Sequence, residues 1–214
     1  SIDEKVKIKI VENSENFENK NELIDRFSNL TIECTGENLG FGGGNNFGFK
    51  KINTKFVLAL SPDTVCDKNF FENIKLYLKG SLEFSLIGVS YYQNEPFTPY
   101  GYFNKSRKIE TLTDSLIDVD WITGCAMLIN LDKYENKKVF DENIFFYFEE
   151  FDLCRRVKNN NGNIYSSKNL FAKHLGKKGS SDPEYELEFE MLRNWHWMWS
   201  KFYYHKKNYG YLYA

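Results

Sequence analysis

Strand-like and helix-like segments alternate along roughly the first ninety residues of the chain. Residues 5–14 (KVKIKIVENS) alternate charged and apolar side chains as a half-buried strand does, and residues 19–28 (NKNELIDRFS) place apolar side chains on one helix face. Further strand patterns occur at 30–36 and 84–92, with a helix pattern at 68–80 between them. This alternation predicts an α/β fold in which helices flank a sheet with parallel strands.

The run KFVLALSPD, at residues 55–63, is apolar until it stops at Ser-Pro-Asp. Such a run is typical of a strand buried on both faces of a parallel sheet, and ligands of these sheets bind beyond the carboxyl ends of the strands. Asp63 therefore lies where a carboxylate would point into a crevice and could bind Mg²⁺ or Mn²⁺. The tetrapeptide SPDT is also a good turn sequence, so a turn-forming role for Asp63 stays open.

Composition narrows the class of protein. The chain has 214 residues, 28 of them basic and 30 acidic, which argues against a general nucleic-acid binder. We expect a single domain over residues 1–214, with a helical tail at 182–214. The four cysteines are far apart, which predicts free thiols in a reducing compartment. The first residues lack the apolar core of a signal peptide, and no apolar run is long enough to span a bilayer. Together these features predict a cytoplasmic protein.

Three carboxylates follow a block of aromatic residues in the segment IFFYFEEFDLCRR. Glu149 and Asp152 are three positions apart and share one face of a helix predicted from residue 149 to about 158, whereas Glu150 points about a quarter turn away. Negative charge is favourable at a helix N-terminus, and the two arginines that follow can pair with Asp152, so a solvated cap would explain the cluster. The aromatic block favours a second interpretation, because apolar surroundings raise the pKa of a carboxyl group towards the range of a general base.

Two other segments contain residues that could bind a ligand. The glycine-rich stretch at residues 36–48 (GENLGFGGGNNFG) lacks the GK[ST] ending of a phosphate loop, so its glycines more plausibly allow close packing and tight turns. His174, in AKHLGKKGS, could be a metal ligand, a phosphate contact or a structural histidine, and the lysines after it would suit a diphosphate.

The order of these segments resembles the bacterial family 2 glycosyltransferases of the rhamnosyltransferase-like branch. The segments cover nearly the whole chain, and they read ENLGFGGGNNFGFK, FVLALSPDT, VDWITGCAMLIN, VFDENIFFYFEEFDLCRRVKNNNGNIY, AKHLGKKGS and RNWHWMWSK. The resemblance implies a GT-A-like fold with a mixed, mainly parallel sheet flanked by helices. It implies inverting, metal-dependent transfer of a sugar from a nucleotide-diphosphate donor, dTDP-rhamnose or a UDP-hexose, to a glycan or lipid-linked acceptor hydroxyl in surface polysaccharide synthesis.

Position by position, the resemblance also implies roles for single residues. The acidic group at the catalytic position comprises Glu149, Glu150 and Asp152, with Glu150 as the base. The ligands of a divalent cation, Mg²⁺ or Mn²⁺, would be Asp63 and His174. The donor-binding residues would be Glu12, Asn13, Gly40, Gly43, Asn45, Asn46 and Ser61. The residues that flank the transferred sugar and the acceptor would be Trp121, Thr123 and Gly124, and those near the diphosphate or a lipid surface Arg193 and Lys201.

The chain departs from the family pattern at several points. Glu12 and Glu150 stand where the family usually has Asp, Ser61 stands where it has Asn, and the family's first strand and helix have no counterpart before Lys5. These departures motivate an alternative function, a non-catalytic module that binds a nucleotide sugar or a glycan. The aromatic, lysine-rich tail motivates another hypothesis, an interfacial helix in peripheral contact with the inner face of the membrane, against which stands a helix packed on the core.

Overall fold

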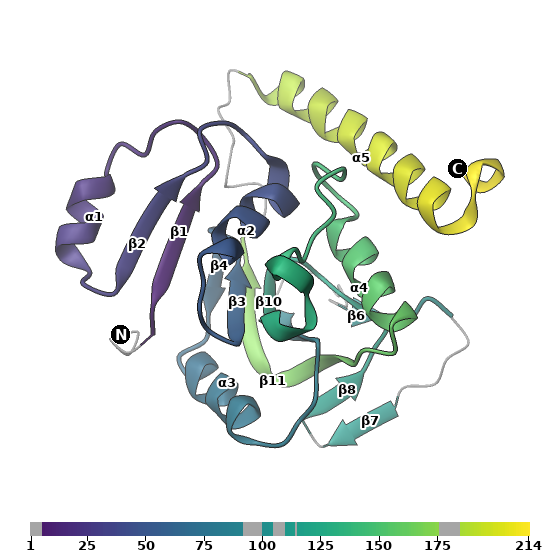
Figure 1. The fold of residues 1–214 in the computed structure, drawn as a ribbon, viewed down its shortest axis with the longest axis horizontal. Helices are drawn as coiled ribbons and strands as arrows, with labels where there is room; N and C mark the ends of the chain where they lie inside the picture. Colours follow the sequence, from purple (N-terminus) through teal and green to yellow (C-terminus); the bar gives the residue numbers. More distant parts are fainter. Residues whose placement is uncertain (1–5, 92–99, 105–109, 114, 176–184) are drawn as a thin grey trace.

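The structure is a computed structural model that describes residues 6–91, 100–104, 110–113, 115–175 and 185–214 (Figure 1). The elements of the first half are β1 (Ile8–Glu12), α1 (Lys20–Arg26), β2 (Leu30–Cys34), α2 (Gly40–Lys50), β3 (Phe56–Leu60), β4 (Thr64–Cys66), α3 (Phe70–Lys79) and β5 (Leu86–Tyr91). Those of the second half are β6 (Tyr100–Gly101), β7 (Glu110–Thr113), β8 (Leu116–Asp118), β9 (Trp121–Ile122), β10 (Ala126–Asn130), α4 (Glu149–Asn159), β11 (Ile164–His174) and α5 (Glu186–Tyr209). Short 3-10 turns occur at Leu131–Lys133, Glu135–Lys137 and Tyr211–Tyr213.

The central sheet has seven strands, in the order β3-β10-β5-β11-β8-β7, with β4 paired to β11. Within it β5 and β11 are parallel, and the remaining pairs are antiparallel. β1 and β2 form a separate parallel pair, and β6 and β9 form a small antiparallel one. The described residues therefore form a mixed α/β fold with flanking helices, as the alternation of strand and helix patterns predicts. The described pairs of the central sheet are mainly antiparallel, however, whereas the sequence predicts a mainly parallel sheet.

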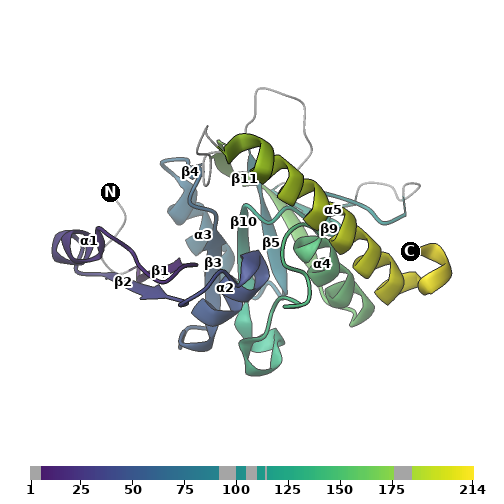
Figure 2. The ribbon, with the colours of Figure 1, turned by 90° about the horizontal axis from the view of Figure 1, so that it is seen from above.

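Strand β10 shows how the two faces of the sheet are filled. Its side chains alternate, because successive residues of a strand point to opposite faces. Met127 and Ile129 join a buried cluster with Phe49 of α2 and Leu153 of α4. Ala126 and Leu128 join a second buried cluster, to which α3 contributes Phe70 and Ile74. Helices α2 and α4 thus cover one face of the sheet and α3 covers the other (Figures 1 and 2).

Strand β3 lies where the apolar run predicts a strand, but its surroundings differ from the prediction. It pairs antiparallel with β10 and forms one end of the seven-stranded sheet. Ala59 is buried, whereas the side chain of Leu60 is 42% exposed. The expectation of a strand buried on both faces of a parallel sheet is therefore wrong, because the pairing is antiparallel and the strand is exposed at its last residue.

The glycine-rich stretch forms helix α2, which the glycines conceal in the sequence because each costs a helix about 1 kcal/mol relative to alanine. Close packing explains several of them. A Cβ atom on Gly48 would lie 2.8 Å from Cγ2 of Val11 in β1, and one on Gly42 would lie 2.9 Å from Cβ of Phe140. The glycines thus let the backbone of α2 lie directly against β1 and the segment before α4, in agreement with the predicted packing role.

Several smaller expectations can be compared with the structure. The two short strands expected near residues 163–175 form one strand, β11, with a shift in its pairing with β5 between Ser167 and Phe171. The polar middle, residues 93–118, contributes β6, β7 and β8, while residues 92–99, 105–109 and 114 lie outside the described part. All four cysteines are free thiols, as expected. Within the described residues, the longest helices lack the apolar length that crossing a bilayer requires.

Candidate active site

The end of β3 and the end of β11 bring Asp63 and His174 together. Thr64, next to Asp63, pairs with His174 in the β4–β11 ladder, and the backbone N–H of Leu175 donates a hydrogen bond to the carbonyl of Asp63 at 2.8 Å. As a result, Nε2 of His174 lies 3.1 Å from Oδ1 of Asp63, and both side chains are partly exposed. The residues that the resemblance assigns to a metal thus lie side by side, although 111 positions separate them in the sequence.

The donor atoms of this pair fit a divalent cation. An octahedral Mg²⁺ holds its ligands at about 2.1 Å, so two neighbouring ligand atoms lie about 3 Å apart, close to the separation seen here. A carboxylate oxygen suits Mg²⁺ or Mn²⁺, and an imidazole nitrogen is a further acceptable ligand for Mn²⁺. The described part of the chain holds no group of three or more His, Cys, Asp or Glu side chains that could complete a metal site. The remaining ligands would therefore have to come from the bound donor or from water.

The turn that carries Asp63 is tied to the segment before β10. The N–H of Ser61 and the hydroxyl of Thr64 both donate hydrogen bonds to the carbonyl of Cys125, at 2.8 and 3.3 Å. Gly124, one residue earlier, lies against both α2 and α4: a Cβ atom there would be 3.5 Å from the ring of Phe41 and 4.0 Å from Cβ of Glu150. The metal-ligand candidates and Glu150 are thus connected through the Thr123–Cys125 segment.

The acidic pair begins helix α4 directly after an unusual turn. Tyr147 and Phe148 both have positive φ values, 66° and 69°, a conformation that residues with a Cβ atom seldom adopt. The helix starts at Glu149, whose side chain is only 4% exposed, and Glu150 is partly buried. Among the described residues, Oε1 of Glu149 has no hydrogen-bond partner. The solvated-cap interpretation is therefore wrong for Glu149, because its carboxyl group is shielded from water.

Burial governs the protonation of this pair. It raises the pKa of Glu149, and the neighbouring charge of Glu150 raises it further. Burial also raises the pKa of Glu150. The rise that the aromatic block predicts is present in both carboxyl groups. Because two adjacent negative charges repel each other, the two carboxyl groups titrate as a coupled pair, and the state in which they hold one proton between them persists above the ordinary glutamate pKa.

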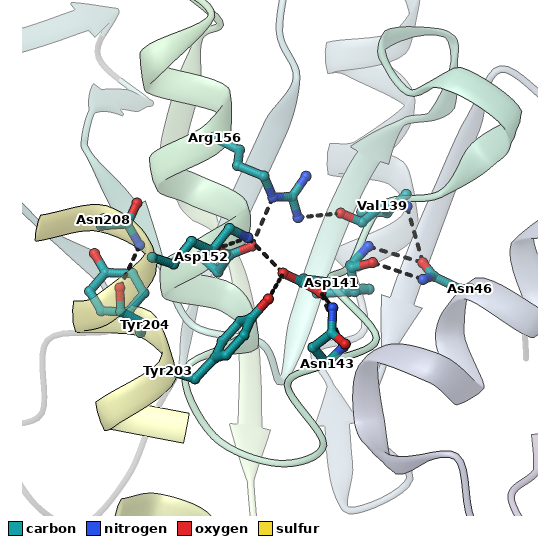
Figure 3. A network of polar contacts seen from close by, with 11 residues as sticks. Asn46, Val139, Asp141, Asn143, Asp152, Arg156, Tyr203, Tyr204 and Asn208 are labelled. Atoms are coloured by element: carbon teal, nitrogen blue, oxygen red, sulfur yellow. Dashed lines mark hydrogen bonds and ion pairs between the residues drawn. The ribbon is translucent and has the colours of Figure 1, made fainter. Parts of the chain in front are cut away.

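Asp152 is fully buried and fully engaged in ion pairs (Figure 3). Its Oδ2 accepts a hydrogen bond from Nε of Arg156 at 2.8 Å, and its Oδ1 accepts one from Nζ of Lys207 at 2.6 Å. Lys207, on α5, also binds Oδ2 of Asp141 at 2.7 Å, and Tyr203 donates to the same oxygen at 3.2 Å. Of the two arginines considered for Asp152, Arg156 makes the pair. Asp152 thus fastens α5 to α4.

Two residues of the predicted donor segment are engaged inside the protein. Asn46 is fully buried: its Nδ2 donates to the carbonyl of Phe140, and its Oδ1 accepts from the N–H groups of Val139 and Phe140 (Figure 3). Asn13 joins the end of β1 to the start of α2, because its Oδ1 accepts from the N–H of Leu39 and its Nδ2 donates to the carbonyl of Gly40. Both asparagines therefore hold backbone segments next to α2 in place, and their predicted contact with a donor stays a prediction.

The other predicted residues lie around these groups. Gly40 has a φ of 72° and packs on the carbonyl of Phe145, which accepts a hydrogen bond from Phe41 at 3.1 Å. Gly43 lies in α2, where a Cβ atom would meet Leu39, and Asn45 donates to the carbonyl of Phe41 in the same helix. Glu12 ends β1 and is half-buried. These residues lie along α2 and β1, and their predicted contact with a donor stays a prediction.

The acceptor-binding candidates lie on β9 and directly after it, and the candidates for the diphosphate or a lipid surface lie on α5. The ring of Trp121 packs on that of Phe151 in α4, at 4.9 Å between centroids. The hydroxyl of Thr123 lies 3.5 Å from the sulfur of Cys125. On α5, Arg193 is half-buried, and the ammonium group of Lys201 lies over the ring of Trp197 at 4.7 Å.

The sequence patterns do not identify several residues that hold the site segments in place. They are Phe41, Cys125, Asp141, Ser200 and Lys207. Cys125 acts through its backbone carbonyl, which any residue could supply, and the partners of Ser200 and Lys207 are more than 50 positions away in the sequence.

Comparisons with known proteins bear on the family and the fold of the chain. A scan against protein-family models finds no match. Residues of the chain are 31% identical over 146 positions to the low-salt glycan biosynthesis hexosyltransferase Agl10 of Haloferax volcanii, a match that covers 61% of this chain and 47% of that protein. They are 23% identical over 147 positions to the rhamnosyltransferase WbbL of Escherichia coli, covering 55% of this chain and 54% of that protein. The chain thus spans about half the length of these relatives.

A solved structure extends the comparison to the fold. The crystal structure of GalNAc-T7 with UDP, GalNAc and Mn²⁺ superposes on this structure with a TM-score of 0.59 at 11% sequence identity. The superposed region covers 82% of this chain and 39% of the GalNAc-T7 chain. At this identity the likeness shows the fold, which is that of a GT-A glycosyltransferase. The named relatives support a glycosyltransferase of the family 2 type. The resemblance and the fold class predicted from the sequence are therefore confirmed.

Proposed function

We propose that the protein transfers a sugar, with inversion, from a nucleotide-diphosphate donor to the hydroxyl group of a glycan or lipid-linked acceptor. One observation carries the proposal: Glu150, a carboxylate whose pKa is raised by burial, lies beside Gly124 at the edge of the sheet where Asp63 and His174 meet. A proton acceptor and a pair of cation ligands are what this reaction requires. The relatives are named as a hexosyltransferase of glycan biosynthesis and a rhamnosyltransferase, which supports a hexose or rhamnose donor and glycan synthesis. Within these classes we propose dTDP-rhamnose or a UDP-hexose as the donor and surface polysaccharide synthesis as the process.

In the proposed reaction, Glu150 accepts the proton of the acceptor hydroxyl while the hydroxyl oxygen forms a bond to the anomeric carbon of the donor. The bond between that carbon and the diphosphate oxygen breaks, and the nucleoside diphosphate leaves with the bonding electron pair. Asp63 and His174 would hold the divalent cation, which when bound neutralises charge on the diphosphate. In the proposed reaction, the proton that the coupled pair holds resides on Glu149, so that Glu150 is the charged member that accepts the acceptor proton.

The decisive test is release of nucleoside diphosphate from a panel of dTDP and UDP sugars, with Mg²⁺ or Mn²⁺ present and suitable acceptors added. We expect Glu150→Gln to lower kcat on the order of 10²- to 10⁴-fold, because general base catalysis contributes that much. Glu135→Gln is the matched control, because Glu135 is exposed in a 3-10 turn away from the acidic pair. In the wild type, kcat should rise with pH through a pKa above the ordinary glutamate value, since the base must be ionised. Turnover of Glu150→Gln near the wild-type rate would exclude Glu150 as the base.

The cation requires a separate experiment. We expect Asp63→Ala to weaken Mn²⁺-dependent donor binding at least tenfold in calorimetry, because it removes the carboxylate of the ligand pair. Glu72→Ala, which removes an exposed carboxylate on α3, is the control. If the wild type binds a nucleotide sugar with Mn²⁺ but releases no nucleoside diphosphate with any acceptor, the alternative function, a non-catalytic binding module, replaces the enzyme.

We infer further that α5 contacts a lipid surface, which would place the site next to a lipid-linked acceptor at the inner face of the membrane. One face of α5 packs on the protein through Ser200 and Tyr204, which are buried. The opposite face presents Leu187, Met191, Trp195 and Met198, all more than half exposed and spaced four, four and three residues apart. Apolar side chains of this size, with lysines such as Lys201 and Lys206 nearby, suit the headgroup layer.

Co-sedimentation with vesicles of neutral and anionic phospholipid tests this contact. The double variant Trp195→Ser, Met198→Ser should reduce the bound fraction about tenfold or more, because each removes a large apolar group. Leu76→Ser, an equally exposed apolar residue on α3, should leave binding unchanged. If the wild type stays in the supernatant, or if the double variant instead abolishes self-association in sedimentation velocity, α5 meets a protein surface and the lipid contact is wrong.

A further inference from the structure

The turn before the acidic pair is held in an unfavourable conformation. Tyr147 and Phe148 are consecutive residues with φ near +70°, and both carry aromatic side chains. For residues with a Cβ atom this left-handed region is crowded, so surrounding contacts must hold the turn in place. The conformation of these two residues sets the direction in which α4 leaves the turn, and with it the positions of Glu149 and Glu150.

Helix α5 supplies contacts that hold this turn. The hydroxyl of Ser200 donates a hydrogen bond of 2.8 Å to the carbonyl of Phe146, and Ser200 is fully buried. The Phe146 carbonyl belongs to the peptide plane that precedes Tyr147, so its orientation directly fixes the φ angle of Tyr147. The ring of Phe148 lies against those of Trp197 and Tyr204, with centroids 6.3 and 5.5 Å away.

We propose that Ser200 is a positioning residue, which holds the left-handed turn Tyr147–Phe148 through the Phe146 carbonyl and thereby places Glu150 against the acceptor hydroxyl. The inference rests on the proposed role of Glu150 as the base. Ser200 donates its hydrogen bond to a backbone carbonyl, so its effect on Glu150 passes through the backbone. A hydroxyl group is needed at this buried position, because the carbonyl that it satisfies belongs to the strained segment itself.

The experiment compares Ser200→Ala with Asn208→Ala. Asn208 also lies on α5 and donates a 2.8 Å hydrogen bond, but to the carbonyl of Tyr204 within the same helix, so it controls for loss of a hydrogen bond from α5 (Figure 3). We expect Ser200→Ala to lower kcat on the order of 10- to 100-fold, with KM for the donor changed by less than about threefold, because misplacement of a base affects the chemical step. Asn208→Ala should keep kcat within about threefold of the wild type.

A second substitution separates positioning from general destabilisation. Glycine adopts positive φ without strain, so Tyr147→Gly in the Ser200→Ala background should recover part of the lost kcat. Loss of folded protein would instead lower activity in proportion to the folded fraction measured by circular dichroism, and glycine would worsen it. If the wild type and Glu150→Gln are equally inactive, the proposed function fails. If Glu150→Gln is inactive while Ser200→Ala matches Asn208→Ala, or if glycine gives no recovery, the positioning role of Ser200 is wrong.

Discussion

Glu149 and Asp152 lie three residues apart on one face of α4, and both are buried, yet the protein treats their carboxyl groups in opposite ways. Asp152 has a cation at each oxygen, Arg156 at one and Lys207 at the other. Glu149 has an oxygen with no hydrogen-bond partner among the described residues, and its neighbour Glu150 is a like charge. The comparison teaches that the partner, rather than burial, decides whether a buried carboxylate holds the structure together or is available for proton chemistry.

The largest effect on stability should come from breaking the ion pairs of Asp152. Asp152→Asn keeps the shape of the side chain but removes the charge that two cations share. We expect the free energy of unfolding to fall by about 3 kcal/mol, the lower end of the range for a broken buried ion pair, because Arg156 and Lys207 still reach water. Urea denaturation measures the change, and an unchanged m-value would show that the unfolded state is unaffected.

Lys158→Met is the control for Asp152→Asn. Lys158→Met removes a cation from the same helix whose partner, Asp118, lies on β8. That pair is more exposed, so its loss should cost about 1 kcal/mol or less. Equal losses in Asp152→Asn and Lys158→Met would contradict the special standing given to Asp152.

Substitution of Glu149 should change the free energy of unfolding in the opposite direction. Burial and the charge of Glu150 raise the pKa of Glu149, so its ionised form destabilises the fold. Glu149→Gln removes that charge, and we expect it to increase the free energy of unfolding at pH 9 by about 1–3 kcal/mol. Urea denaturation at several pH values measures the effect, with kcat followed in parallel.

The pH dependence of the stability change in Glu149→Gln distinguishes the removal of a buried charge from an improvement in packing. A carboxyl group whose folded pKa is raised keeps its proton longer in the folded state than in the unfolded chain. Its contribution to stability is therefore greatest at low pH and is lost as pH rises through the raised value. The increase in the free energy of unfolding that Glu149→Gln produces should accordingly vanish near pH 4, where Glu149 of the wild type is protonated and, like glutamine, uncharged. A gain of the same size at pH 4 and pH 9 would show that packing, rather than charge, is responsible.

The sequence predicts well those features of the site that depend on residues close together in the chain. Helix α4 begins at Glu149, as expected, because the acidic residues of its first turn and the asparagines after it act as local signals within the helix itself. Asp63 follows its strand for the same reason, since an apolar run ended by Ser-Pro is a local pattern. The aromatic residues directly before the acidic pair predict a raised pKa, and burial raises the pKa of both carboxyl groups in the structure.

The remaining features depend on partners that are distant along the chain. Arg155 and Arg156 were equal candidates for Asp152, and three-dimensional packing separates them: Arg156 makes the ion pair, while Arg155 lies between the rings of Phe103 and Tyr209. Helix α2 was missed because its glycines oppose a helix locally, and its stability comes from contact with β1.

Asp141 offers the smallest and most specific test of the comparison, because it shares Lys207 with Asp152 (Figure 3). Burial opposes its ionisation, but the hydrogen bonds from Lys207 and Asn143 outweigh burial and hold the pKa of Asp141 at about 2. A depressed pKa contributes stability that is present above the ordinary value near 4 and is lost as pH falls through about 2. We expect Asp141→Asn to lower the free energy of unfolding at pH 7 by about 1–2 kcal/mol, less than the full shift implies, because Lys207 keeps Asp152 as a partner. In the Asp152→Asn background the cost should rise, since Lys207 then loses both carboxylates. Strictly additive losses in the double variant would show that the two aspartates do not act through one lysine.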